Sequence, residues 1–255
     1  MIKVIKSIPT EVEKVVFIGD THHPFQDKVA IRLMLSFIRW FQPQFIYLIG
    51  DIIDMYAVSS YSKDANKASK FQLEIDATIE FLHHVKNACP DAEIAYKDGN
   101  HEDRLVTYIK KHEEMAGLKA LTIPALLELD SLGITHQGYR GYLSHHNFLV
   151  EHGDRVSVGS AMTAKKMFER RQNSGISGHT HRLGAHHRTT LQGHYTWYEN
   201  GCLCHMDPEY INGTPDWQHG FSIGHYLLEE ERMVIDQIPI INGSLFYQGK
   251  LFKVS

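Results

Sequence analysis

Two histidines, His179 and His181, stand one residue apart in the stretch GISGHTHRLGAHH, directly after an apolar run that reads as a strand. Residues i and i+2 of a strand point to the same face, so the two imidazoles could converge on one point. Neutral imidazole is the commonest metal-ligating side chain, and a convergent pair indicates a metal site. Taken alone, a polar loop with histidines on its surface explains the stretch equally well.

Four more short polar motifs follow apolar, strand-like runs. They are Asp20-Thr-His22, Gly50-Asp51-Ile-Ile-Asp54, Gly99-Asn100-His101-Glu102 and His152-Gly-Asp154. Each is weak by itself, because Gly-Asp is common in turns and Asn can cap a helix. In open α/β sheets, ligands bind beyond the carboxyl ends of the strands. Five such ends that supply Asp, Asn and His favour one shared metal site over coincidence.

Strands and helices alternate in the first half of the chain. Residues 15–19, 45–50 and 93–99 are short apolar runs that end at Gly, as buried strands do. Apolar residues recur at helical spacing over 30–41 and 71–85, and Pro43 and Pro90 stop these runs. This alternation predicts a largely parallel sheet.

The second half contains many short strand-like pieces separated by Gly, Asn and charged turns, which is typical of antiparallel strands. One helix is expected at about residues 158–171. The polar segment 55–70 has no clear period and is a candidate active-site loop.

Composition limits the class of protein. The chain has 255 residues, 43% hydrophobic and 22% charged, as expected for a folded globular protein. Neither a linker nor a repeat divides it, so residues 1–255 are predicted to form a single domain. The net charge of −4 argues against broad electrostatic adhesion to nucleic acid or to an anionic membrane, and leaves a local basic patch open.

The cysteines and the N-terminus indicate a cellular location. Cys89, Cys202 and Cys204 form neither a disulfide framework nor a C-x-x-C pair, which favours reduced thiols in the cytoplasm. The four consecutive apolar residues at 15–18 are too few for a signal-peptide core or a membrane span. We therefore expect a cytoplasmic protein without membrane contact, and its oligomeric state stays open.

Together, the five motifs resemble those of the calcineurin-like metallophosphoesterase family: D-x-H, G-D-x-x-D, G-N-H-E/D, a later His and G-H-x-H. The matching residues are Asp20/His22, Asp51/Asp54, Asn100/His101, His152 and His179/His181. The resemblance implies an α/β fold in which a two-sheet β-sandwich is flanked by helices, in four layers αββα. The segment NGCLCHMDPEY also resembles small members of this family that phages and prophages encode.

The resemblance further implies two divalent metal ions at the strand tips. The implied ligands are Asp20, His22 and His181 for one ion, Asn100, His152 and His179 for the other, and Asp51 between them. A shared carboxylate suits a bridge because it has two oxygens and a negative charge. Mixed nitrogen and oxygen ligation without a thiolate fits Mn, Fe, Zn, Co or Ni, of which manganese is favoured here.

Such a centre indicates phosphoester hydrolysis. Two cations about 3.5 to 4 Å apart can clamp a phosphoryl group while a metal-bound hydroxide attacks in line. The departing oxygen needs a proton, and His101, next to Asn100, is the candidate general acid. Asp54 is its expected orienting carboxylate, as in the family's dyad, and would raise the imidazole pKa. A helix N-cap or turn role is the alternative for Asp54.

The sequence departs from the motifs of one branch of the family, and these differences limit the expected class of substrate. Protein phosphatases of the family carry D-x-H-G and G-D-x-x-D-R-G, whereas this chain has DTHHP and GDIIDMY and lacks the phosphate-gripping Arg there. We expect a phosphodiesterase, with nucleic acid or a nucleotide as the phosphoester substrate. The alternatives are a phosphomonoesterase and a non-catalytic, metal-stabilised binding scaffold, and the presence of His101 argues against the scaffold.

Several other side chains are weaker candidates. Arg104 could grip a phosphate oxygen, although a solvated helix residue is an equal alternative. A basic cluster on the expected 158–171 helix could follow a nucleic-acid backbone, although a solvated face is the commoner meaning; its members are Lys165, Lys166, Arg170 and Arg171. The aromatic residues of the second half, including Trp197, could stack a nucleic-acid base, although alternating aromatics in strands more often belong to the core.

The remaining histidines carry no predicted role. His145 and His146 are among them, and His23, next to His22, is expected at the surface.

Overall fold

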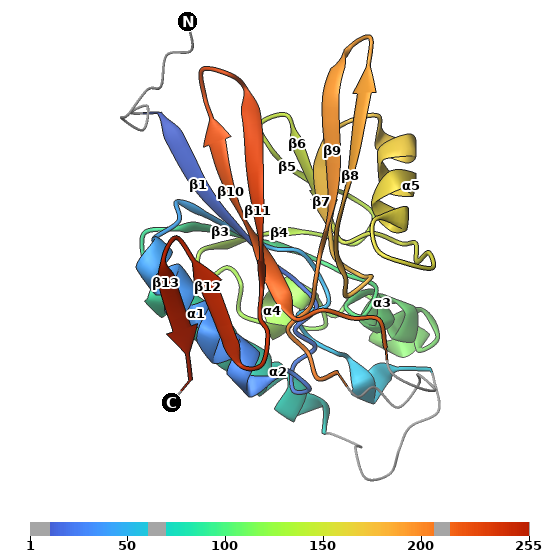
Figure 1. The fold of residues 1–255 in the computed structure, drawn as a ribbon. Helices are drawn as coiled ribbons and strands as arrows, with labels where there is room; N and C mark the ends of the chain where they lie inside the picture. Colours follow the sequence, from blue (N-terminus) through green and yellow to red (C-terminus); the bar gives the residue numbers. More distant parts are fainter. Residues whose placement is uncertain (1–10, 61–69, 207–214, 255) are drawn as a thin grey trace, which may run out of the picture.

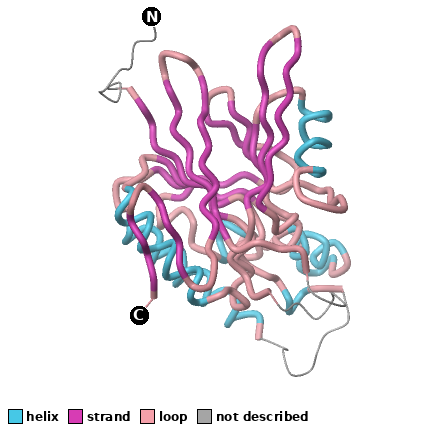
Figure 2. Tube along the Cα trace, viewed as in Figure 1, coloured by secondary structure: helices cyan, strands magenta, loops and turns pink. Residues whose placement is uncertain are grey.

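The computed structural model describes residues 11–60, 70–206 and 215–254, and Figures 1 and 2 show how its strands and helices are arranged. A six-stranded sheet has the order β11 (Arg232–Pro239), β10 (Gly220–Leu227), β1 (Val12–Ile18), β2 (Phe45–Leu48), β3 (Glu93–Lys97) and β4 (Ile134–Gln137). Strands β1 to β4 are parallel, whereas β10 pairs antiparallel with β1 and with β11. The parallel pairing brings the carboxyl ends of β1, β2 and β3 to one edge.

Strand β1 is apolar on both faces because it lies between two layers. Val16 and Ile18 pack in the cluster beneath the helices, whereas Val15 and Phe17 pack toward the second sheet. Successive side chains of a strand point to opposite faces, so the continuous apolar run VVFI fills both interfaces.

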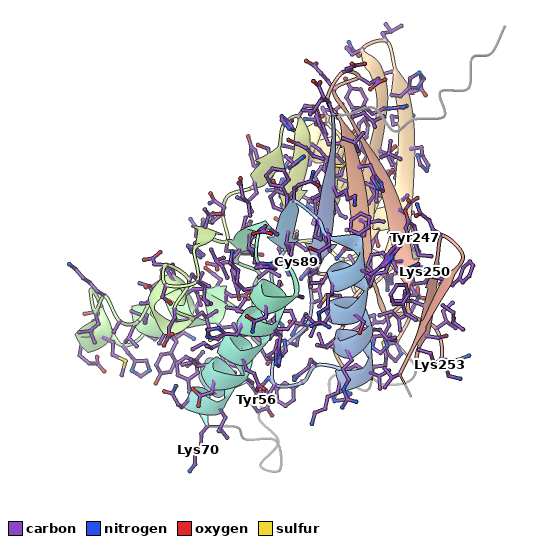
Figure 3. All side chains as sticks on the ribbon, turned by 90° about the vertical axis from the view of Figure 1, so that its left-hand side faces the viewer. Tyr56, Lys70, Cys89, Tyr247, Lys250 and Lys253 are labelled. Carbon is purple, nitrogen blue, oxygen red and sulfur yellow. The ribbon has the colours of Figure 1, made fainter. Side chains whose placement is uncertain are left out.

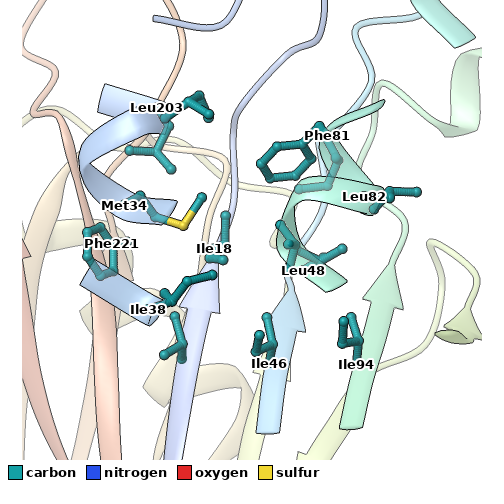
Figure 4. Packing of buried hydrophobic residues seen from close by; sticks show 14 of the residues in the cluster. Ile18, Met34, Ile38, Ile46, Leu48, Phe81, Leu82, Ile94, Leu203 and Phe221 are labelled. Atoms are coloured by element: carbon teal, nitrogen blue, oxygen red, sulfur yellow. The ribbon is translucent and has the colours of Figure 1, made fainter. Parts of the chain in front are cut away.

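Helices α1 (Lys28–Phe41) and α2 (Phe71–Ala88) cover one face of this sheet (Figure 1). The side chain of Asp27 caps α1 by accepting from the Ala30 amide at 2.8 Å. Figure 4 shows Met34 and Ile38 of α1 beside Ile18, in a cluster that also contains Leu82 of α2. The helical spacing in the sequence therefore marks the faces that pack on the sheet.

The second sheet has the order β5 (Leu143–His145), β6 (Phe148–Glu151), β7 (Gly175–Ser177), β9 (Gly193–Asn200) and β8 (Leu183–Thr190). Phe148, Val150 and Ile176 face the first sheet across the sandwich. On the outer face, α5 (Met162–Arg171) packs Met167 and Phe168 against the buried Trp197, which is thus a core residue as expected. The layers are helix, sheet, sheet, helix, which confirms the predicted fold class.

Two predictions for the second half were wrong in part. Strand β7 is parallel to β6 because α5 returns the chain to the same end of the sheet, and β9 is parallel to β7 because the antiparallel strand β8 returns it before β9. The helix expected from residue 158 begins at Met162, since Gly159 and Ala161 have left-handed backbones with φ of 86° and 64°.

Shorter elements complete the chain. They are the 3-10 turns η1 (Tyr56–Val58) and η2 (Glu113–Met115), helices α3 (Asp103–Lys110) and α4 (Ile123–Leu126), and the hairpin β12 (Ser244–Tyr247) and β13 (Lys250–Lys253). Figure 3 shows Tyr247 and Lys250 of the hairpin beside α1, and the Lys250 ammonium lies 4.9 Å from the ring centroid of Trp40. Most of the predicted loop 55–70 lies outside the described residues. Within the described residues, no helix has the length and apolar character needed to cross a membrane.

Candidate metal centre

The chain turns sharply where β1 and β2 end. The amides of Asp20 and His22 donate to the carbonyls of Gly50 and Asp51 at 3.0 and 2.9 Å, which ties the two strand ends together. Asp20, His22 and Asp51 all have left-handed backbones, with φ of 52°, 49° and 51°. Such conformations are costly for residues with a Cβ and gather at functional sites.

One cluster of potential ligands joins β1 to the turn after β7. Nε2 of His181 lies 3.2 Å from Oδ1 of Asp20 and 3.1 Å from Nε2 of His22. All three side chains are almost completely buried. These are the residues predicted for the first ion.

A second cluster gathers around Asp51. Nε2 of His152 lies 3.2 Å from Oδ2 of Asp51 and 3.0 Å from Oδ1 of Asn100. The other ring nitrogen of His152 donates to the Ile49 carbonyl at 3.0 Å, which aims Nε2 into the cluster. Ligand atoms of Asp51, His152 and His179 all lie within 4.8 Å of one another.

Asp51 also lies beside the first cluster, because its Oδ2 is 3.8 Å from Nε2 of His22. His179 and His181 do not share one point as the i, i+2 rule suggested. Both follow β7 in left-handed conformations, with φ of 70° and 59°, and each joins a different cluster. The structure therefore brings together all seven residues that the sequence nominated as ligands.

The glycines of these motifs make room for the ligands. A Cβ on Gly50 would lie 2.6 Å from Nδ1 of His152, and a Cβ on Gly99 would overlap the Asp51 carboxylate. Gly50 also has φ of 94°, which disfavours other residues. The Gly in G-D and in G-N-H is thus required by close packing at the strand ends.

The clusters carry negative charge that needs a counter-charge. Burial raises the pKa of Asp51, but the neighbouring His101 and His152 hold that pKa well below its ordinary value. Burial disfavours imidazolium, yet Asp51 raises the pKa of His152 to about 9, and Cys204 and Asp20 raise the pKa of His181 to about 10. A pocket of carboxylate oxygens and imidazole nitrogens that attracts positive charge fits divalent cations.

His101, Asp54 and Arg104 form a group beside these clusters. Nδ1 of His101 lies 2.9 Å from the carbonyl oxygen of Asp54 and 3.3 Å from Oδ2 of the Asp54 carboxylate. Nε2 of His101 lies 3.7 Å from Oδ2 of Asp51. Arg104 donates from Nη1 to the Asp54 carbonyl and from Nη2 to Nε2 of His101, both at 2.9 Å. Although burial opposes it, Asp51 and Asp54 raise the pKa of His101. Asp54 caps no described helix, since Met55 precedes η1.

Comparison with known families decides the class of protein. The sequence profile described as calcineurin-like phosphoesterase matches residues 13–228. The chain belongs to this family.

Phage proteins are among the relatives of this chain. The Gene 54 protein of Mycobacterium phage D29 is 29% identical over 95% of this chain and 99% of its own length. The Gene 54 protein of Mycobacterium phage L5 is 27% identical over the same shares. Both fit the phage-type resemblance of the sequence.

Solved structures with similar folds share little sequence. Vps29 from Entamoeba histolytica, complexed with zinc, is 13% identical with a TM-score of 0.47, and the match covers 94% of this chain and 98% of that one. YfcE, a phosphoesterase from E. coli, is 14% identical with a TM-score of 0.42, and the match covers 89% of this chain and all of that one.

Glu102 is a residue of this site to which the sequence assigned no role. Its fully buried carboxylate accepts from the amides of Asp51, Ile52 and Gly99 at 3.0, 2.9 and 2.7 Å, and from the Tyr96 hydroxyl at 2.7 Å. It thereby fixes the two turns that carry the candidate ligands Asp51 and Asn100. Its place after Asn100 and His101 in the family motif was the only available signal.

His181 has two further neighbours that the sequence did not connect with it. Sγ of Cys204 lies 3.8 Å from Nδ1 of His181, and the Trp217 ring centroid lies 4.1 Å from that of His181. Cys89, Cys202 and Cys204 are all free and buried.

The surface position expected for His23 is wrong. Its side chain is 2% exposed and its ring centroid lies 4.5 Å from that of Phe81. Neither ring nitrogen has a hydrogen-bond partner among the described residues. The polar motif around His23 gave no sign of this burial, because only the folded structure packs α2 against the turn that follows β1.

The basic face of α5 is partly neutralised. Arg170 donates to Asp154 at 2.8 Å, and Arg171 donates to Glu151 at 2.8 and 2.7 Å. Lys165 lies 3.9 Å from Glu169. Carboxylates of the protein therefore pair with much of the positive charge that could otherwise bind a nucleic-acid backbone.

Proposed function

We propose that this chain is a dinuclear-metal phosphodiesterase that acts on nucleic acid or on a nucleotide. The observation that carries the proposal is the position of Asp51, whose carboxylate faces ligand atoms of both clusters. A single carboxylate between two sets of nitrogen and oxygen donors is suited to bridge a pair of cations, because it has two oxygens and a negative charge.

The proposed ligands are those named from the sequence, with Asp20, His22 and His181 on one ion and Asn100, His152 and His179 on the other. When bound, such ions supply Lewis-acid polarisation of the phosphoryl oxygens and an activated water as nucleophile. The favoured metal is manganese. The proposed enzyme comprises residues 1–255 as one domain and works in the cytoplasm.

His101 is the proposed proton donor to the leaving oxygen. Its Nδ1 is held by Asp54, so its Nε2 is the atom that faces Asp51 and the reaction. In the structure, Arg104 donates to this Nε2, which requires the neutral form of His101. We infer that an incoming phosphate draws the Arg104 guanidinium away, so that Nε2 takes up a proton from solvent and then donates it to the leaving oxygen.

A phosphomonoesterase is the second candidate, because the Glu of G-N-H-E that protein phosphatases also carry is present as Glu102. A metal-stabilised binding scaffold is the third. Against the scaffold, His101 and Asp54 lie within hydrogen-bonding distance beside the clusters, an arrangement that metal binding alone does not require.

One assay separates the three. The full-length chain with Mn²⁺ is given bis-p-nitrophenyl phosphate and p-nitrophenyl phosphate. Turnover of the diester supports the proposal, preferential turnover of the monoester favours the second candidate, and turnover of neither favours the scaffold. A panel of single-stranded DNA, duplex DNA, RNA and cyclic nucleotides then identifies the substrate.

A further inference from the structure

Apart from the two clusters of the candidate metal centre, another group of potential ligands lies where β1 begins. Nε2 of His145 and Nε2 of His146 lie 2.9 and 2.8 Å from the same atom, Oε2 of Glu13. Glu13 and Ile18 are roughly 16 Å apart along β1 at about 3.3 Å per residue, so this group is remote from the site that follows Ile18. In Figure 1, β1 starts at the upper end of the sandwich, away from α1 and α2.

We propose that Glu13, His145 and His146 bind a divalent cation of the zinc class. Two imidazole nitrogens and one carboxylate oxygen form a ligand set that zinc uses, with a water completing four-coordination. The three ligand atoms already lie within 4.8 Å of one another. This site stands independently of the proposed phosphodiesterase activity.

The geometry needs only a small adjustment to admit the ion. Ligands about 2.0 to 2.1 Å from a tetrahedral zinc ion lie about 3.3 Å apart, so each nitrogen must move from Glu13 by roughly half an ångström. The side chains of Glu13 and His146 are 23% and 44% exposed, which gives them freedom to move and gives the ion a path from solvent.

His145 is oriented for ligation by a second contact. Its side chain is 4% exposed, and its Nδ1 lies 3.0 Å from the Tyr47 hydroxyl. A hydroxyl can donate or accept, so this contact survives when Nδ1 keeps the proton and Nε2 presents a lone pair to a metal. An outer partner of this kind is typical of histidine ligands.

His146 is held in place by a strained turn. It has φ of 51° in the two-residue connection between β5 and β6, where Gly or Asn is the usual residue. Its ring stacks on Tyr226 at 4.3 Å with an interplanar angle of 18°. Backbone strain at a residue that offers a ligand atom is the pattern found at functional sites.

A cation here would join the two sheets. Glu13 belongs to β1 of the six-stranded sheet, whereas His145 belongs to β5 of the other sheet. Zinc binding would therefore stabilise the sandwich at the end opposite the candidate active site.

The test measures zinc content and melting temperature. The full-length wild type and the variants His146→Ala, Glu13→Gln and His187→Ala are dialysed against buffered free Zn²⁺, and bound zinc is measured by mass spectrometry. His187 is an exposed histidine outside both groups and serves as the matched control. We expect His146→Ala and Glu13→Gln to bind one zinc ion fewer per chain than the wild type and the control.

The double variant His146→Ala/His152→Ala should likewise bind one zinc ion fewer than His152→Ala alone, because the Glu13 site is separate from the candidate metal centre. The zinc-dependent rise in Tm should shrink in His146→Ala and persist in His187→Ala. Equal zinc content in all four chains overturns the proposal and leaves Glu13, His145 and His146 as a hydrogen-bonded cluster. Circular dichroism verifies that each variant is folded.

Discussion

The carboxylate of Asp54 lies 3.3 Å from the imidazole of His101, measured from Oδ2 to Nδ1. The same oxygen lies 3.0 Å from Nδ1 of His22. Both rings thereby turn Nε2 toward Asp51, at 3.7 Å from His101 and 3.8 Å from His22. One carboxylate thus orients a candidate proton donor and a candidate metal ligand.

We predict that His101→Ala retains its metals but loses most activity on a diester with a poor leaving group. The loss should be about 10²- to 10⁴-fold, the usual contribution of general acid catalysis. With bis-p-nitrophenyl phosphate the loss should be smaller, because p-nitrophenolate departs without a proton. Steady-state kinetics on both substrates, with metal content measured in parallel, checks this. Equal losses on both would exclude the proton-donor role.

We predict that Asp51→Asn binds fewer ions at both clusters, because the substitution removes the charge that they share. Metal analysis of the dialysed variant checks this result. Asp154→Asn is the matched control, since Asp154 is half-exposed and pairs with Arg170 outside the clusters. Undiminished metal content in Asp51→Asn would contradict its place between the ions.

We predict that Glu102→Gln weakens metal binding and lowers the free energy of unfolding by about 1 to 3 kcal/mol. The amide has one acceptor oxygen in place of two, so some amides of the Asp51 and Gly99 turns lose their partner. Metal titration and urea unfolding check the two effects.

Glu74→Gln is its matched control. Glu74 is equally buried, and its carboxylate accepts from the amides of Tyr56 and Ala57 at 2.8 and 2.9 Å. This control should lose stability while its metal affinity is retained. The same loss of metal affinity in both variants would mean that Glu102 has no special part in positioning the ligands.

We predict that the free energy of unfolding of His23→Phe increases relative to that of the wild type as the pH falls. Burial lowers the pKa of His23 to about 3, whereas an unfolded histidine titrates near 6.5. Between these values the unfolded chain binds the extra proton, so His23 reduces the free energy of unfolding as pH falls. From pH 7.5 to 5.0 the advantage of the variant should grow by about 2 kcal/mol.

Urea unfolding in EDTA at pH 7.5 and 5.0 measures this difference. His194→Phe, at an exposed histidine, should leave the pH dependence unchanged. A His23→Phe chain with the same pH dependence as the wild type would show that His23 is protonated in the folded state.

The amino-acid sequence determined the local elements and the order of the motifs. Apolar periodicity is imposed by the backbone geometry of each segment, so the strand at Val15 to Ile18 and helix α1 are readable without tertiary contacts. Parallel strands end at a common edge, so the pairing of β1 with β2 and of β2 with β3 also placed Asp20, Asp51 and Asn100 together.

Only the tertiary structure decided which side chains belong to which of the two clusters. The left-handed turns after β7 send His179 and His181 to different clusters, and the packing of α2 buries His23. Residues far apart in the chain meet through strand register and sheet packing, and neither leaves a periodic trace in the sequence. For the same reason, His145 and His146 gained a common partner in Glu13 only when the two sheets were packed together.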